Sequence, residues 1–152
     1  MYRFTILIVV VLFVTGCGSS SRPKDLPPLH SCVITVMQDG KPLADARVTL
    51  VPEAGHWNAT GSSDTAGVAE MFTSGSYQGV PEGKYRVCVM KIETLAGKPS
   101  EDDSKPGEPD RNFNLVDPQY SDTLESPLYI GVVKGTKEYK IDVGKAVKIP
   151  LL

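Results

Sequence analysis

Hydrophobic and polar residues alternate with a period of two along several short stretches of this chain. In the clearest case Ala46, Val48 and Leu50 lie between polar neighbours, the pattern of a strand with one buried and one solvated face. Other stretches with strand composition are residues 33–37, 68–73, 84–91, 128–133, 138–143 and 147–151. The inward row of 84–91 would be Tyr85, Val87 and Val89. The pattern predicts an all-β protein.

Turn-forming residues separate these stretches. Residues 39–42 read Asp-Gly-Lys-Pro, residues 63–67 read Ser-Asp-Thr-Ala-Gly, and residues 81–83 read Pro-Glu-Gly. Residues 134–136, Lys-Gly-Thr, are predicted to join 128–133 and 138–143 as a hairpin. Short strands at turn-punctuated intervals favour an antiparallel sandwich or barrel.

One long segment departs from this rhythm. Residues 93–125 are rich in acidic residues and proline and contain few apolar residues. We expect one long acidic loop, mobile in its first half to about Arg111. Its three adjacent acids, Glu101 to Asp103, have oxygens of the kind that calcium binds, but such acids are usually only solvated, and no metal site is predicted.

Residues 1–16 have the layout of a signal peptide. Arg3 precedes the apolar run 6–14, which is too short to cross a bilayer because a membrane helix needs about 20 residues. A basic start, a short apolar centre and small residues at the exit are typical of a secretory leader. We therefore expect residues 1–16 to be removed.

The end of this leader, Val-Thr-Gly-Cys at 14–17, resembles the bacterial lipobox. The resemblance implies that Cys17 is the lipidation site: its sulfur receives diacylglycerol, and its new amino group is acylated, as with palmitate. An ordinary leader with an incidental cysteine is the alternative. Residues 17–31, with glycine and serine followed by prolines, are expected to form a flexible tether. Gly18, where inner-membrane lipoproteins of enteric bacteria have Asp, favours the outer membrane of the cell envelope.

Size and charge exclude several classes of protein. The chain has 152 residues, with 16 basic against 18 acidic side chains, and residues 32–152 suffice for one domain. The sequence contains no basic patch of the kind that binds nucleic acid, so a nucleic-acid partner is not predicted. Beyond Cys17, Cys32 and Cys88 form an even pair in a chain bound for an oxidising compartment. A disulfide and two separate buried thiols both remain open at this point.

Three motifs in chain order resemble one family. They are Asp-Gly-Lys-Pro-Leu-Ala-Asp-Ala-Arg-Val at 39–48, Asp-Thr-Ala-Gly-Val-Ala at 64–69 and Pro-Glu-Gly-Lys-Tyr-Arg-Val at 81–87. Together they resemble the carboxypeptidase regulatory-like domains, transthyretin-like β-sandwiches related to the Cna protein B-type repeats. The resemblance implies an antiparallel Greek-key β-sandwich, transthyretin-like or immunoglobulin-like, of about seven strands. The motifs specify a fold and are silent about a ligand.

Candidate chemistry is sparse. The two histidines, His30 and His56, lie in the tether and in an expected loop, and no catalytic or metal-ligating set is evident, so we predict neither an enzyme nor a cofactor. The first hypothesis is a lipid-anchored structural or protein-interaction module of the cell envelope. The second is an extracytoplasmic carbohydrate-binding module that uses three aromatic residues: Trp57, Tyr77 and Tyr120. The expected partners are the membrane, through the lipid, and an envelope protein or polysaccharide.

Overall fold

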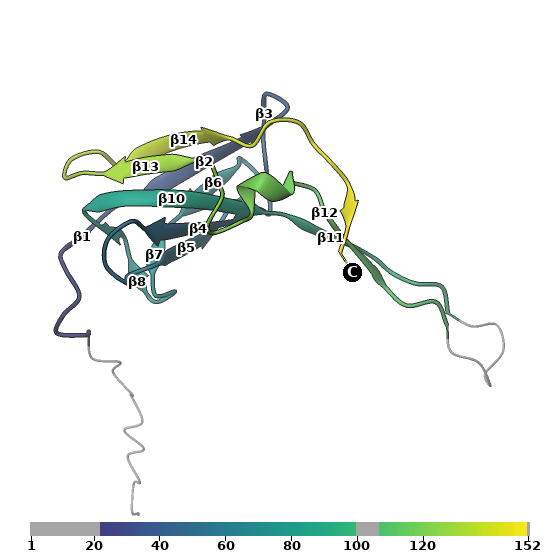
Figure 1. Ribbon diagram of the computed structural model, residues 1–152, viewed down its shortest axis with the longest axis horizontal. Coiled ribbons are helices and arrows are strands. Elements are labelled where there is room, and N and C mark those ends of the chain that lie inside the picture. Colours follow the sequence, from purple (N-terminus) through teal and green to yellow (C-terminus); the bar gives the residue numbers. More distant parts are fainter. Residues whose placement is uncertain (1–21, 100–106, 152) are drawn as a thin grey trace, which may run out of the picture.

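The computed structural model describes residues 22–99 and 107–151, which form β-sheets around one hydrophobic core, without an α-helix (Figure 1). The larger sheet has the order β13 (Tyr129–Val132), β10 (Gly83–Met90), β4 (Arg47–Pro52), β5 (Ala59–Ser62), β7 (Phe72–Thr73) and β8 (Tyr77–Gln78). The second sheet has the order β14 (Glu138–Asp142), β2 (Val33–Gln38) and β3 (Lys41–Pro42), and β6 (Val68–Glu70) also pairs with β2.

Two smaller sheets complete the described fold. β1 (Leu29–His30) pairs with β9 (Val80–Pro81). The other has three strands in the order β11 (Ile92–Leu95), β12 (Arg111–Asn114) and β15 (Ile149–Pro150). The predicted all-β class with antiparallel sheets is confirmed, and it is consistent with a sandwich, although β14 pairs with β2 in parallel. The Greek-key order and the strand number of about seven are not confirmed, because the described residues form fifteen strands, many of two residues.

The core explains the period of two in the sequence. Fully buried side chains enter it from both main sheets: Ile34, Val36, Val48, Leu50, Val87 and Val89. Ala46 is also fully buried, and Tyr85 is 2% exposed, with its hydroxyl donating to the Pro81 carbonyl at 3.0 Å. Both predicted inward rows are therefore confirmed.

The predicted turn at 39–42 joins β2 to β3. Asp39 and Gly40 have positive φ angles of 50° and 71°, and Gln38 lies opposite Lys41 across the hairpin. Two successive positive φ angles fit the right-handed twist of a two-residue hairpin, and Asp-Gly is a preferred pair there.

The stretch 68–73 is two strands rather than one. β6 pairs with β2 in one sheet and β7 pairs with β5 in the other, with Met71 fully buried between them. The chain therefore crosses from one sheet to the other through the core at this residue.

The predicted hairpin of 128–133 with 138–143 is wrong. β13 pairs with β10, whereas β14 pairs with β2, so the two strands belong to different sheets. Each buries one face in the common core, Ile130 and Val132 from β13 and Ile141 from β14. Residues 134–136 therefore connect two sheets instead of closing a two-stranded ribbon.

The prediction of an irregular segment over 93–125 is also wrong in part, since this range contains β12 and most of β11, as well as a short 3-10 helix, η1 (Pro118–Tyr120). Likewise, the end of the expected tether 17–31 is folded onto the body. Leu26 is buried, and β1 lies within the same range.

Candidate functional site

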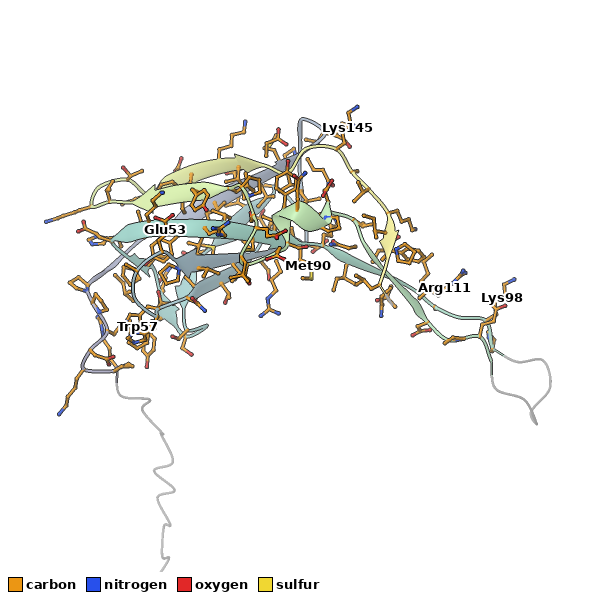
Figure 2. All side chains as sticks on the ribbon, in the orientation of Figure 1. Glu53, Trp57, Met90, Lys98, Arg111 and Lys145 are labelled. Atoms are coloured by element: carbon orange, nitrogen blue, oxygen red, sulfur yellow. The ribbon has the colours of Figure 1, made fainter. Side chains whose placement is uncertain are left out.

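A three-stranded sheet projects from one end of the body, and we call β11, β12 and β15, with the flanking residues 96–99 and 107–110, the arm (Figure 1). Beyond the strands, the segments 96–99 and 107–110 remain hydrogen-bonded to each other. The Glu108 amide donates to the Lys98 carbonyl at 2.9 Å, and the Gly97 amide donates to Asp110 Oδ1 at 2.9 Å. The arm lies at the end of the body opposite β1, as the positions of Arg111 and Trp57 in Figure 2 also show.

Hydrogen bonds at its base fix the direction of the arm. The Leu115 amide donates to the Lys91 carbonyl at 2.8 Å, and the Leu115 carbonyl accepts from Gln38 Nε2 at 2.9 Å. The buried Asn114 side chain accepts from the amide of Val116, which is itself fully buried in the core. The arm is thus anchored to β2 and to the core.

Exposed apolar side chains concentrate on the arm. Among the described residues eight large hydrophobic side chains are exposed, and five lie in the arm or at its base: Met90, Ile92, Leu95, Ile149 and Leu151. Ile92 is 51% exposed. Clustered exposed apolar surface marks sites of interaction in soluble domains more often than scattered single residues do.

The two faces of the arm differ in chemistry. Residues directly opposite one another share a face, so Ile92 lies in one row with Asn114 and Ile149. The other face carries Glu93 beside Phe113, and Lys148 Nζ lies 4.8 Å from the Phe113 ring centre and pairs with Glu93. One face therefore carries Ile92 and Ile149 with Asn114, and the other carries the charged and aromatic side chains together with Leu95, which lies two positions from Glu93.

An open groove of about 420 Å³ adjoins the base of the arm on the outer face of β4 and β10. Met90, labelled in Figure 2, belongs to both the groove and the arm base. The other lining residues are mostly hydroxyl-bearing, with one cation: Arg47, Thr49, Thr60, Cys88, Val89, Ser121 and Thr123. This lining holds no carboxylate or imidazole that would act as a general base.

The two histidines lie at the other end and do not meet. His30 Nε2 is 3.6 Å from Glu82, and His56 Nε2 is 3.5 Å from Asp25. No three metal-ligating side chains come together within residues 22–99 and 107–151. The calcium-type acids Glu101, Asp102 and Asp103 lie outside the described residues.

The three aromatic residues considered for sugar binding do not share one surface. Trp57 lies 4.6 Å, ring centre to ring centre, from His56. The chain before Tyr77 approaches that loop, since the Ser74 amide donates to the Asn58 carbonyl. Tyr120, in η1, instead packs against the hydrophobic core. The structure brings the loop of Trp57 close to the turn that precedes Tyr77 and leaves Tyr120 apart.

Both described cysteines are free thiols. Cys32, at the edge of the core, is 1% exposed, and burial raises its pKa to about 11. Cys88 lies on the groove side of β10, where its sulfur donates to the Asp122 carbonyl at 3.4 Å. Burial raises the Cys88 pKa as well, against a lowering effect of Arg86. Of the two arrangements left open by the sequence, the structure has separate buried thiols.

Burial of the Cys32 thiol predicts a loss of stability in alkali. Its pKa rises from 9.0 to about 11 on folding. The contribution of the neutral thiol to stability is therefore fully present below pH 9 and is lost as the pH rises through 11. At about pH 10.5 the free energy of unfolding is expected to be about 2 kcal/mol lower than below pH 9. Denaturant unfolding of residues 22–152 at neutral and alkaline pH should show this extra loss for wild type and not for Cys32→Ala.

The control for this prediction is Cys88→Ala, which keeps the Cys32 thiol and should retain the alkaline loss. Tyr85, whose pKa burial raises to about 12, contributes equally to all three proteins, apart from its coupling to Cys32. Equal alkaline losses in wild type and Cys32→Ala would contradict the assignment. A count of fewer than two titratable thiols in denatured residues 22–152 would also contradict the assignment.

The hydrophobic pattern of the sequence does not indicate the apolar residues of the arm. Ile92 immediately precedes the acidic range 93–125 and Leu95 lies within it, and polar residues occur on both faces of β11 and β12. The only signal was the final apolar alternation at Ile149 and Leu151, which had no identifiable partner strand.

Searches of protein-family models, curated proteins and solved structures found no match to this chain. Over the described ranges there is no helix with the length and hydropathy that a membrane crossing requires.

Proposed function

We propose that this protein is a lipid-anchored, non-enzymatic module of the bacterial cell envelope that presents the arm to a protein partner. Lipid on Cys17 attaches it to a membrane, with the outer membrane favoured, and the body is a transthyretin-like sandwich. The observation that carries the proposal is the concentration of exposed apolar side chains on a projecting arm anchored at its base.

The layout of the molecule supports this role. The described N-terminal segment is fixed at one end of the body by β1 and by buried Leu26, and the arm projects from the other end. A lipid attached close to residue 22 therefore leaves the arm at the far side of a rigid body, accessible to a partner.

The carbohydrate-binding alternative has less support. Its platform needs Trp57, Tyr77 and Tyr120 on one surface, and Tyr120 packs against the core instead. Trp57 is half-buried, beside His56, at the end of the body that carries the N-terminal segment.

A photo-cross-linking amino acid at Leu95 should capture a protein partner in intact envelopes. Leu95 lies in β11 and is 38% exposed, so the probe replaces a side chain already at the surface of the arm. Cross-linked products are separated by mass and identified, which distinguishes another protein from a second copy.

The matched control places the same probe at Val133, which is 53% exposed and follows β13, away from the arm. The yield from Leu95 should exceed that from Val133 several-fold. Equal yields at both positions, or products only from Val133, would show that the arm is not the interaction surface.

A further inference from the structure

We infer that the arm pairs with the arm of a second copy of this chain, through the outer edge of β11. This inference rests on the proposed role of the arm as the interaction site and names its partner. Three observations carry it: the open strand edge of β11, the position of this edge in line with the start of β4, and the protection of the opposite edge of the arm.

Within residues 22–99 and 107–151, the backbone groups on the outer edge of β11 have no strand partner. The Leu115 amide donates to the Lys91 carbonyl, on the side of β11 that faces β12. Because bonded positions alternate along an antiparallel pair, the N–H and C=O groups of Ile92 and Thr94 point to the other side. No described strand pairs with β11 there.

This open edge continues the line of β4. The last pair between β10 and β4 joins Met90 to Arg47, where β4 begins. Beyond it β11 runs on, while Ala46 turns into the core and its amide donates to Ser63 Oγ at 2.9 Å. A strand added to β11 would thus lie end to end with β4.

The opposite edge of the arm is protected. Immediately after β15 the Leu151 amide donates to the Asn112 carbonyl, so position 150 directs its backbone outward, and that residue is Pro150. Proline has no N–H to offer a further strand, which is how natural sheets block their edges. The outward positions of β11, Ile92 and Thr94, carry no such block.

One register makes this edge self-complementary. Antiparallel pairing about a two-fold axis, with Thr94 opposite Thr94 of the second copy, sets Glu93 opposite Leu95. A register centred on Glu93 would oppose two carboxylates, which destabilises a pair. A register centred on Ile92 would place Thr94 of the second strand opposite Met90, whose edge is already occupied by Arg47, whereas the Thr94 register places residue 98, beyond the end of β11, at that position.

Pairing in this register closes the assembly. The result is one six-stranded sheet, β15-β12-β11 joined to β11-β12-β15 of the second copy, with Pro150 at both outer edges. A two-fold interface uses the same patch on both subunits, and the two remaining edges carry Pro150, so association stops at the dimer.

Sedimentation velocity of residues 22–152, over a concentration series, tests the inference. We expect a monomer–dimer equilibrium with a dissociation constant on the order of 100 µM or below, because the interface is small. Thr94→Pro removes an outward N–H together with the hydroxyl bond to Asn112, and it should raise this constant at least about 10-fold. Thr94→Val keeps the N–H and the branched side chain, loses only the hydroxyl bond to Asn112, and should dimerise like wild type.

A second measurement covers the case in which Thr94→Pro fails to fold. Thr94→Cys, treated with a short bifunctional maleimide, should give a cross-linked dimer, whereas Thr136→Cys, exposed and outside the arm, should not. A wild-type chain that stays monomeric throughout the series, or a folded Thr94→Pro that still dimerises, overturns the inference. Capture of a different protein at Leu95 by a monomeric chain would keep the proposed function and overturn only the second copy as partner.

Discussion

Cys17→Ala is expected to abolish incorporation of labelled palmitate into this protein in growing bacteria. The proposed lipidation rests on the resemblance of residues 14–17 to the lipobox, in which the final cysteine carries the acyl groups, and Cys17 is the residue in that position. As a matched control, Cys32→Ala removes a thiol from the body and should leave labelling unchanged. Label retained in Cys17→Ala would contradict the assignment.

Loss of the lipid should also release the body from the membrane. Each buried methylene contributes about 0.8 kcal/mol, so two or three acyl chains bind much more tightly than the single chain that gives only marginal, reversible binding. Residues 18–152, exported behind an ordinary secretory leader, should therefore appear in the soluble fraction after cell disruption, whereas the wild-type protein is expected to sediment with membranes. A body that sediments without its lipid would have to bind the membrane through its own surface.

The sequence could predict those strands whose two faces have different surroundings. At Val48 and Val87 the alternation is imposed by a core on one side and water on the other, and the structure buries these residues fully. The Asp39-Gly40 turn was likewise predictable, because positive φ at two successive positions selects for such residues.

Pairing over long distances could not be predicted in the same way. β13 and β14 are close in the sequence, and each has one buried face, which suits a hairpin and two separate sheets equally well. The partner of β14 is β2, about a hundred residues earlier, and nothing local to residues 138–142 specifies that choice.

The arm was hidden for a related reason. Both faces of β11 contact water, so Glu93 and Thr94 are as acceptable there as Ile92, and no period of two develops. Its strands are held by backbone pairing and by anchors at the base such as the Gln38–Leu115 hydrogen bond. A candidate site built on exposed edges is therefore harder to find in a sequence than one built on a buried face.

Gly67→Ala is expected to lower the free energy of unfolding by about 3 kcal/mol, a large share of the roughly 5–15 kcal/mol typical of a domain. Gly67 has φ +76°, where a side chain costs about 1–2 kcal/mol. Its added Cβ would also lie 2.8 Å from the Val36 carbonyl oxygen and 2.9 Å from Pro42 Cβ. Because the Val36 amide donates to the Gly67 carbonyl, relief of this overlap would strain the turn against β2.

Gly40→Ala separates the two contributions to this loss. Gly40 has a nearly equal φ of +71°, but its added Cβ would meet no atom within 4 Å, so only the backbone cost of about 1 kcal/mol applies. Denaturant unfolding of residues 22–152 should place Gly40→Ala between wild type and Gly67→Ala. If the two variants were equally destabilised, contact of the 63–67 turn with β2 and β3 would contribute nothing, and the loss would come from backbone conformation alone.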